Sequence, residues 1–127
     1  MLGLHLHTAN WKLGKLVTFG QPRFLSEKGV QAVAALPLLR VTDSRDVVHC
    51  AFPLLFHCGT ELLLLSDPYY HLNERAPQQR DLKQSMLEEK ALSAALAAHT
   101  PESFVKRLQA RLQSSKPVTD IEVNMYM

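Results

Sequence analysis

Short apolar runs recur along the chain, and their lengths and end residues predict strands. Residues 15–19 (KLVTF) are rich in β-branched and aromatic side chains and stop at Gly20, as strands commonly do. A second strand is expected over 38–42. A third, over 61–65, is apolar on both faces, which is typical of a strand covered by helices on either side.

Helical patterns lie between and after these strands. Ser26 is placed to cap a short helix over 27–35, and a helix rich in Ala, Leu, Glu and Lys is expected over 81–98. Thr100 is the expected N-cap of a last helix, with proline at its first position. Its apolar face is predicted to hold Phe104, Val105, Leu108 and Leu112, and its polar face Lys106, Arg107 and Arg111.

Alternating strands and helices favour an α/β layer fold with a largely parallel sheet, as one domain over 1–127. Residues 1–113 are expected to form the ordered core, and 114–127 a frayed tail or weak edge strand. The segment 51–56 is apolar but contains Pro53, so an irregular loop is expected there.

Composition excludes several classes of protein. Of the 127 residues 46% are hydrophobic and 20% are charged, with a formal net charge of +2, so no basic surface for nucleic acid is expected. Unbroken apolar runs such as 62–65 are far too short for a transmembrane helix. No secretory signal is recognisable, which makes the cytoplasm the default location. Two cysteines are too few for a disulfide scaffold, and both are expected to be reduced.

Two residues could carry acid–base chemistry. Asp46 follows the end of a predicted strand, where sites in α/β sheets gather, and its carboxylate could orient a histidine. The alternative is a loop aspartate that bonds its own backbone. His99 lies between two predicted helices, and imidazole titrates near neutral pH, as a general acid or base requires. The alternative is a capping or surface histidine.

Two His-Cys pairs, His49-Cys50 and His57-Cys58, contain residue types that bind zinc. The close C-x-x-C spacing of zinc sites is missing, so buried thiols and a structural histidine are the favoured interpretation. We expect neither a metal nor a cofactor. Phosphate-binding and dinucleotide-binding glycine motifs are absent, and no serine stands in a G-x-S-x-G motif.

Four segments in order resemble the class 3 (fungal-type) lipases of the α/β-hydrolase fold. They are KLVTFGQPRFL at 15–25, RVTDSRDVV at 40–48, HCGTE at 57–61 before an apolar strand, and a histidine at 99 followed by Phe104 on an amphipathic helix. The family usually has proline where this chain has His49.

The resemblance implies roles for particular residues. Asp46 would be the acid of a catalytic triad and His99 its base, with Asp43 as an alternative acid and His57 as a packing residue. The order of acid before histidine agrees with hydrolases of this fold. The family's nucleophile lies upstream of the T-F-G strand, so the chain resembles the C-terminal half of a lipase, with nucleophile, oxyanion donors and lid before residue 1.

The expected function is therefore that of a lipase or carboxylesterase fragment acting on acyl esters at a lipid–water interface, inactive without its serine. Phe52, Leu54 and Leu55 could contact lipid, although core packing is an equal alternative. The alternative function is a noncatalytic interaction module derived from a hydrolase. In a fragment that lacks the upstream strands, the open sheet edge would favour self-association.

Overall fold

The computed structural model describes residues 2–48, 52, 54–73, 96–119 and 122–126. One sheet holds five strands in sequential order: β1 (Leu16–Phe19), β2 (Leu38–Asp43), β3 (Thr60–Leu64), β4 (Tyr69–Asn73) and β5 (Lys116–Pro117). β1 with β2, β2 with β3 and β4 with β5 pair in parallel, whereas β3 and β4 are antiparallel. This mixed, mostly parallel sheet with helices is compatible with the predicted α/β class.

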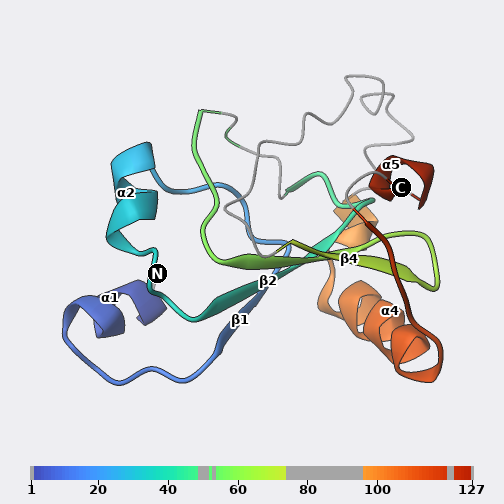
Figure 1. Cartoon of the computed structure of the whole chain (residues 1–127), viewed down its shortest axis with the longest axis horizontal. Coiled ribbons are helices and arrows are strands. Elements are labelled where there is room, and N and C mark those ends of the chain that lie inside the picture. Colours follow the sequence, from blue (N-terminus) through green and yellow to red (C-terminus); the bar gives the residue numbers. More distant parts are fainter. Residues whose placement is uncertain (1, 49–51, 53, 74–95, 120–121, 127) are drawn as a thin grey trace.

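The helices lie at the two ends of the sheet in Figure 1: α1 (Leu2–Thr8), α2 (Glu27–Ala32), α4 (Pro101–Gln113) and α5 (Val123–Tyr126). α1 and α2 lie together on the left, and α4 and α5 lie on opposite sides of the sheet on the right. No helix in the described ranges is long and apolar enough to cross a membrane. The helix predicted over 81–98 lies largely outside the described residues, and only 96–98 are seen, in a helical turn.

Both predicted N-caps are present, Ser26 at α2 and Thr100 at α4. The Ser26 hydroxyl accepts a hydrogen bond from the Gly29 amide at 3.2 Å, as an N-cap does. α2 ends at Ala32 rather than at residue 35, because Val33 leaves helical geometry and is buried beside Leu25 and Leu38. Packing of this valine therefore sets the end of the helix.

The third strand is covered on both faces, as its sequence predicted. Neighbouring residues of a strand point to opposite sides of the sheet. Leu64 accordingly packs with Val41 of β2 and Phe104 of α4, and Leu63 with Val123 of α5. Full burial of one leucine contributes about 1.5–3 kcal/mol, so β3 anchors both layers of helices.

The predicted faces of α4 are wrong at four positions, although Lys106 is exposed as predicted. Arg107 and Arg111 are buried, with exposed fractions of 6% and 8%, whereas Val105 and Leu112 are exposed at 53% and 87%. The two guanidinium groups reach acceptors at the ends of the strands, which turns that side of the helix inward. Phe104 remains buried as predicted.

The C-terminal segment packs on the sheet through β5 and α5. Its strand pairs with β4, a strand that the sequence pattern did not reveal. The rings of Tyr126 and Tyr69 stack with centroids 3.9 Å apart, and the Ser66 amide and hydroxyl both donate to the Tyr126 carbonyl at 2.7 Å. The described parts of 114–127 thus cover the Leu63 side of β3.

Candidate active site

Asp46 lies in the turn that follows β2, at the carboxyl ends of the parallel strands. Its amide donates to the Asp43 carbonyl at 2.9 Å, and its Oδ1 accepts from the Val48 amide at 2.8 Å. The residue is completely buried. One carboxylate oxygen therefore bonds the local backbone, as loop aspartates do, and the other is free for a second partner.

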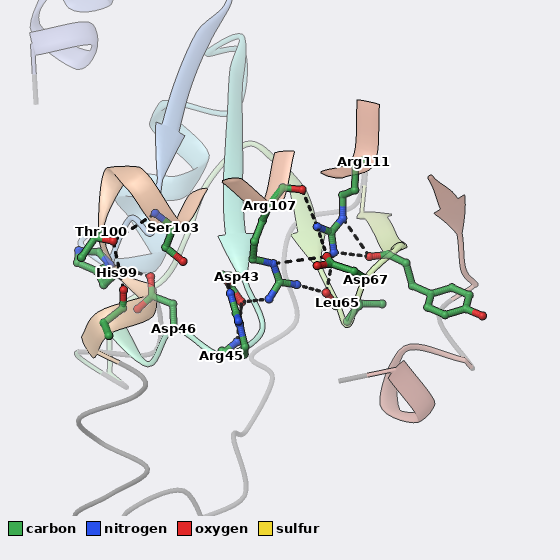
Figure 2. A network of polar contacts seen from close by, with 12 residues as sticks. Asp43, Arg45, Asp46, Leu65, Asp67, His99, Thr100, Ser103, Arg107 and Arg111 are labelled. Carbon is green, nitrogen blue, oxygen red and sulfur yellow. Dashed lines mark hydrogen bonds and ion pairs between the residues drawn. The ribbon is translucent and has the colours of Figure 1, made fainter. Parts of the chain in front are cut away.

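That second partner is His99, which lies 53 positions later in the chain (Figure 2). The His99 Nδ1 and Asp46 Oδ2 atoms are 2.7 Å apart. Thr100 caps α4 directly after the histidine, since its Oγ1 accepts from the Ser103 amide at 3.2 Å and donates to the Ala97 carbonyl at 3.2 Å. The imidazole is thus held at a helix start against a buried carboxylate.

This geometry defines what the pair can do chemically. A carboxylate at Nδ1 favours the tautomer with the proton on that nitrogen, which leaves Nε2 as a proton acceptor. The His99 side chain is 36% exposed, so the ring is not sealed from solvent. Chemically, the His99 ring can accept a proton at Nε2 while the buried Asp46 carboxylate bonds its other nitrogen.

Gly20 lies directly against the pair, at the end of β1. Its φ is +55°, in the left-handed region, and a Cβ on this residue would stand 2.5 Å from His99 Nδ1 and 2.6 Å from Asp46 Oδ2. The position therefore requires glycine both for backbone conformation and for space. The sequence analysis used Gly20 as the end of a strand and as part of the segment 15–25, but did not predict its contact with Asp46 and His99.

An apolar pocket of about 400 Å³ opens beside the histidine. It is lined by Phe19, His99, Pro101, Phe104, Val105 and Leu108. The rings of Phe19 and Phe104 meet edge to face with centroids 5.6 Å apart. The pocket therefore presents hydrocarbon next to a proton acceptor, an arrangement that suits an apolar ligand with one reactive polar group.

Asp43, the alternative acid, makes different contacts. Its carboxylate is completely buried and binds Arg107 Nη1 at 3.0 Å and Arg45 Nη2 at 2.8 Å. Burial lowers the pKa of the Arg107 guanidinium, and the nearby Asp43 carboxylate opposes part of that shift. Asp43 therefore belongs to an arginine cluster next to the Asp46–His99 pair, as Figure 2 shows.

Arg111 extends this cluster toward β4. Its guanidinium donates to the carbonyls of Leu65 at 2.6 Å and Tyr69 at 2.9 Å, and it pairs with Asp67 at 2.7 Å. The Arg107 guanidinium also donates to the Leu65 carbonyl. Helical periodicity alone had predicted that these two arginines face solvent, whereas both are buried.

The predicted lipid-contact residues lie elsewhere on the surface. Phe52 is 61% exposed and Leu54 89% exposed, whereas Leu55 is half-buried. The Leu55 amide donates to the Phe52 carbonyl at 2.9 Å, which forms a turn. None of the three lines the pocket beside His99.

The His-Cys pairs are only partly described, because His49 and Cys50 lie outside the described residues. His57 is buried, and burial raises the pKa of the Cys58 thiol while Arg40 acts in the opposite direction. Within the part of the chain that the structure describes, no group of three or more His, Cys, Asp or Glu side chains could hold a metal ion.

The fold and the site together define an α/β protein with a buried carboxylate–histidine pair at the carboxyl ends of parallel strands. No protein-family model, no curated protein and no solved structure matches the chain.

Proposed function

We propose that Asp46 and His99 are the acid and base of a serine hydrolase that cleaves acyl esters, with the nucleophilic serine outside residues 1–127. The 2.7 Å contact between His99 Nδ1 and the buried Asp46 Oδ2 carries this proposal. It is the geometry that holds an imidazole in the tautomer a serine nucleophile needs.

In the proposed reaction, His99 Nε2 takes the proton of the serine hydroxyl as its oxygen attacks the ester carbonyl carbon. The tetrahedral intermediate collapses, and the same nitrogen gives its proton to the leaving alcohol. Water, activated by His99, then hydrolyses the acyl-serine and releases the acid. Asp46 stabilises the imidazolium that forms in each half of the cycle.

The sheet supports a nucleophile beside β1. Among the described residues β1 pairs only with β2, and its other edge is unpaired. A parallel strand added at that edge would lie about 4.8 Å away, and Gly20 at the end of β1 is already in contact with the pair. A serine at the end of such a strand would be close to His99, as in the α/β-hydrolase fold that the motifs resemble.

The apolar pocket supports an acyl ester as the substrate class. Its lining residues, Phe19 and Val105 among them, offer hydrocarbon to an acyl or alkyl chain, with the ester group at His99. Exposed Phe52 and Leu54 would add contacts to a lipid–water interface.

The test begins with the reading frame upstream of the Met1 codon. We expect an in-frame G-x-S-x-G about two to four helical turns ahead of Met1. The extended protein should hydrolyse p-nitrophenyl butyrate, and His99→Gln should lower kcat by on the order of 10³-fold or more. Lys106→Gln, an exposed change on α4, is the control and should leave the rate unchanged.

Two results would contradict the proposal. One is an upstream frame without a serine motif, and the other is ester hydrolysis that survives His99→Gln. The 127-residue chain alone should not hydrolyse the ester. Robust hydrolysis by that chain, abolished by His99→Ala, would reveal a different nucleophile.

A second candidate is a noncatalytic interaction module, which the open edge of β1 favours. Val17 and Phe19 on this strand are 47% and 49% exposed, so the edge and its side chains are available to a different partner protein. Light scattering and thermal unfolding of the purified chain separate the two functions. A clean monomer with one sharp transition favours the module, and aggregation favours the incomplete hydrolase.

A further inference from the structure

We infer that Asp43 and Arg107 are positioning residues, and that their ion pair holds His99 against Asp46. The inference rests on the proposed roles of Asp46 and His99 as acid and base. It concerns two residues that touch neither the His99 ring nor the apolar pocket. The argument follows the two segments that meet at the pair: the turn after β2, and α4.

Asp43 organises the turn that carries the acid. Its carbonyl accepts from the Asp46 amide at 2.9 Å, and its Oδ1 accepts from the Arg45 amide at 2.9 Å. The side chain and the main chain of one residue therefore close the turn over 43–46. Any shift of Asp43 moves the backbone of Asp46 with it.

Arg107 fixes the helix that follows the base. Its Nη1 donates to Asp43 Oδ1 at 3.0 Å, and its other terminal nitrogen donates to the Leu65 carbonyl at the end of β3. The six helical steps from Pro101 to Arg107 span about 9 Å along the axis, and the N-cap Thr100 joins Pro101 to His99. Because the intervening α4 is a continuous helix capped at Thr100, the distance between Arg107 and His99 is fixed.

The Asp43–Arg107 ion pair is buried, so neither charge can turn to water without moving the chain that carries it. Asp43 has no exposed side-chain surface and Arg107 only 7%. Removing Arg107 leaves the buried Asp43 carboxylate with only the half-exposed Arg45 as its cation. Removing Asp43 leaves the buried Arg107 guanidinium with only Asp67, 3.9 Å away, as its counter-ion. The remaining charge must then move toward that partner or toward water. Either movement displaces the turn or α4, and with it one member of the Asp46–His99 pair.

Arg111 provides the contrast on the same helix. It is as buried as Arg107, but it binds the carbonyls of Leu65 and Tyr69 and the half-exposed Asp67, and has no contact with Asp43. Its role is to hold the second half of α4 to the turn before β4. Arg111→Met should therefore destabilise the fold without separating His99 from Asp46.

The experiment measures the tautomer of the His99 ring in the full chain, by ¹⁵N–¹H correlation spectra above pH 8. Arg107→Met and Asp43→Asn should each lower the ratio of the Nδ1–H tautomer to the Nε2–H tautomer by about twofold or more. A twofold change corresponds to the smallest coupling energy expected between residues of one hydrogen-bond network. Asp46→Asn gives the ratio for the broken pair. Arg111→Met and Lys106→Met are the buried and exposed controls, and their ratios should match the wild type.

The proposal is overturned if Arg107→Met and Asp43→Asn fold and keep the wild-type ratio, or if Arg111→Met shifts it equally. Where both variants fail to fold, Arg107→Lys decides. It keeps the buried cation, but one ammonium cannot hold both acceptors in the guanidinium geometry. A wild-type ratio in folded Arg107→Lys then overturns the proposal. Because the readout is the ring and not turnover, absence of esterase activity bears only on the proposed function.

Discussion

Replacing Gly20 by alanine tests whether the contact between Asp46 and His99 requires a residue without a Cβ at the end of β1. The added Cβ has two separate costs. The first is backbone strain, because φ is +55° and an L residue in the left-handed region loses about 1–2 kcal/mol. The second is a steric clash, with His99 Nδ1 2.5 Å and Asp46 Oδ2 2.6 Å from the new carbon.

The clash adds about 1–3 kcal/mol if the surroundings cannot move. Asp46 is completely buried and cannot retreat, whereas the His99 side chain is 36% exposed and can swing outward. We therefore expect a total loss of about 2–5 kcal/mol, nearer the lower value if the ring leaves. At about 4 °C per kcal/mol for a chain of this size, the Tm should fall by about 8–20 °C.

Gly14→Ala is the matched control, because a Cβ at Gly14 meets nothing within 4 Å. Urea denaturation gives the free energy of unfolding of both variants, and the His99 tautomer reports whether the ring has left Asp46. We expect Gly20→Ala to be the less stable by at least about 2 kcal/mol and to shift the tautomer. Equal stability of the two variants within about 0.5 kcal/mol, with an unchanged ring, would refute the reasoning.

Three further outcomes follow from burial and charge. Phe104→Ala should cost about 3–5 kcal/mol in thermal or urea unfolding, whereas Val105→Ala, at a 53% exposed position, should stay within about 0.5 kcal/mol. Two hydrogen bonds from Thr119 to the Glu122 carboxylate lower its pKa. The stability that these bonds contribute should therefore be lost as the pH falls through that lowered pKa. A Glu122 pKa measured by NMR at or above the ordinary glutamate value would contradict this. Burial raises the pKa of Cys58, so alkylation at pH 8 should be slow until urea unfolds the chain.

The strands and the helix starts could be predicted because their signals are local. The segment 15–19 carries its own β pattern, and Ser26 and Thr100 cap the helices that follow them. The contact between Asp46 and His99 had no such local signal. From composition and position, His99 could equally have been a capping residue, and Asp46 could have bonded only its own backbone. Only the order of the family motifs along the chain predicted that Asp46 and His99 act together.

The arginines of α4 show what a single helix cannot reveal. Periodicity separates charged from apolar positions, but it does not say whether a charged position faces water or a buried acceptor. For Arg107 the acceptor is Asp43, 64 positions away, and for Arg111 it is the carbonyl of Leu65, 46 positions away. Strand β4 escaped prediction. The weak edge strand expected within 114–127 is present as β5, but its pairing with β4, a segment far away in sequence, was not predicted.

The turn after β2 holds two buried carboxylates three positions apart, and their partners separate their roles. Asp43 faces guanidinium groups, which stay protonated throughout the accessible pH range, so its contacts are permanent. Asp46 faces an imidazole, whose far nitrogen, Nε2, can accept a proton. Only the second pair can respond to a proton arriving at the far nitrogen of the ring. In the function that we propose, acid–base chemistry therefore belongs to Asp46 and His99, and in the further inference Asp43 and Arg107 hold the turn and α4 in place.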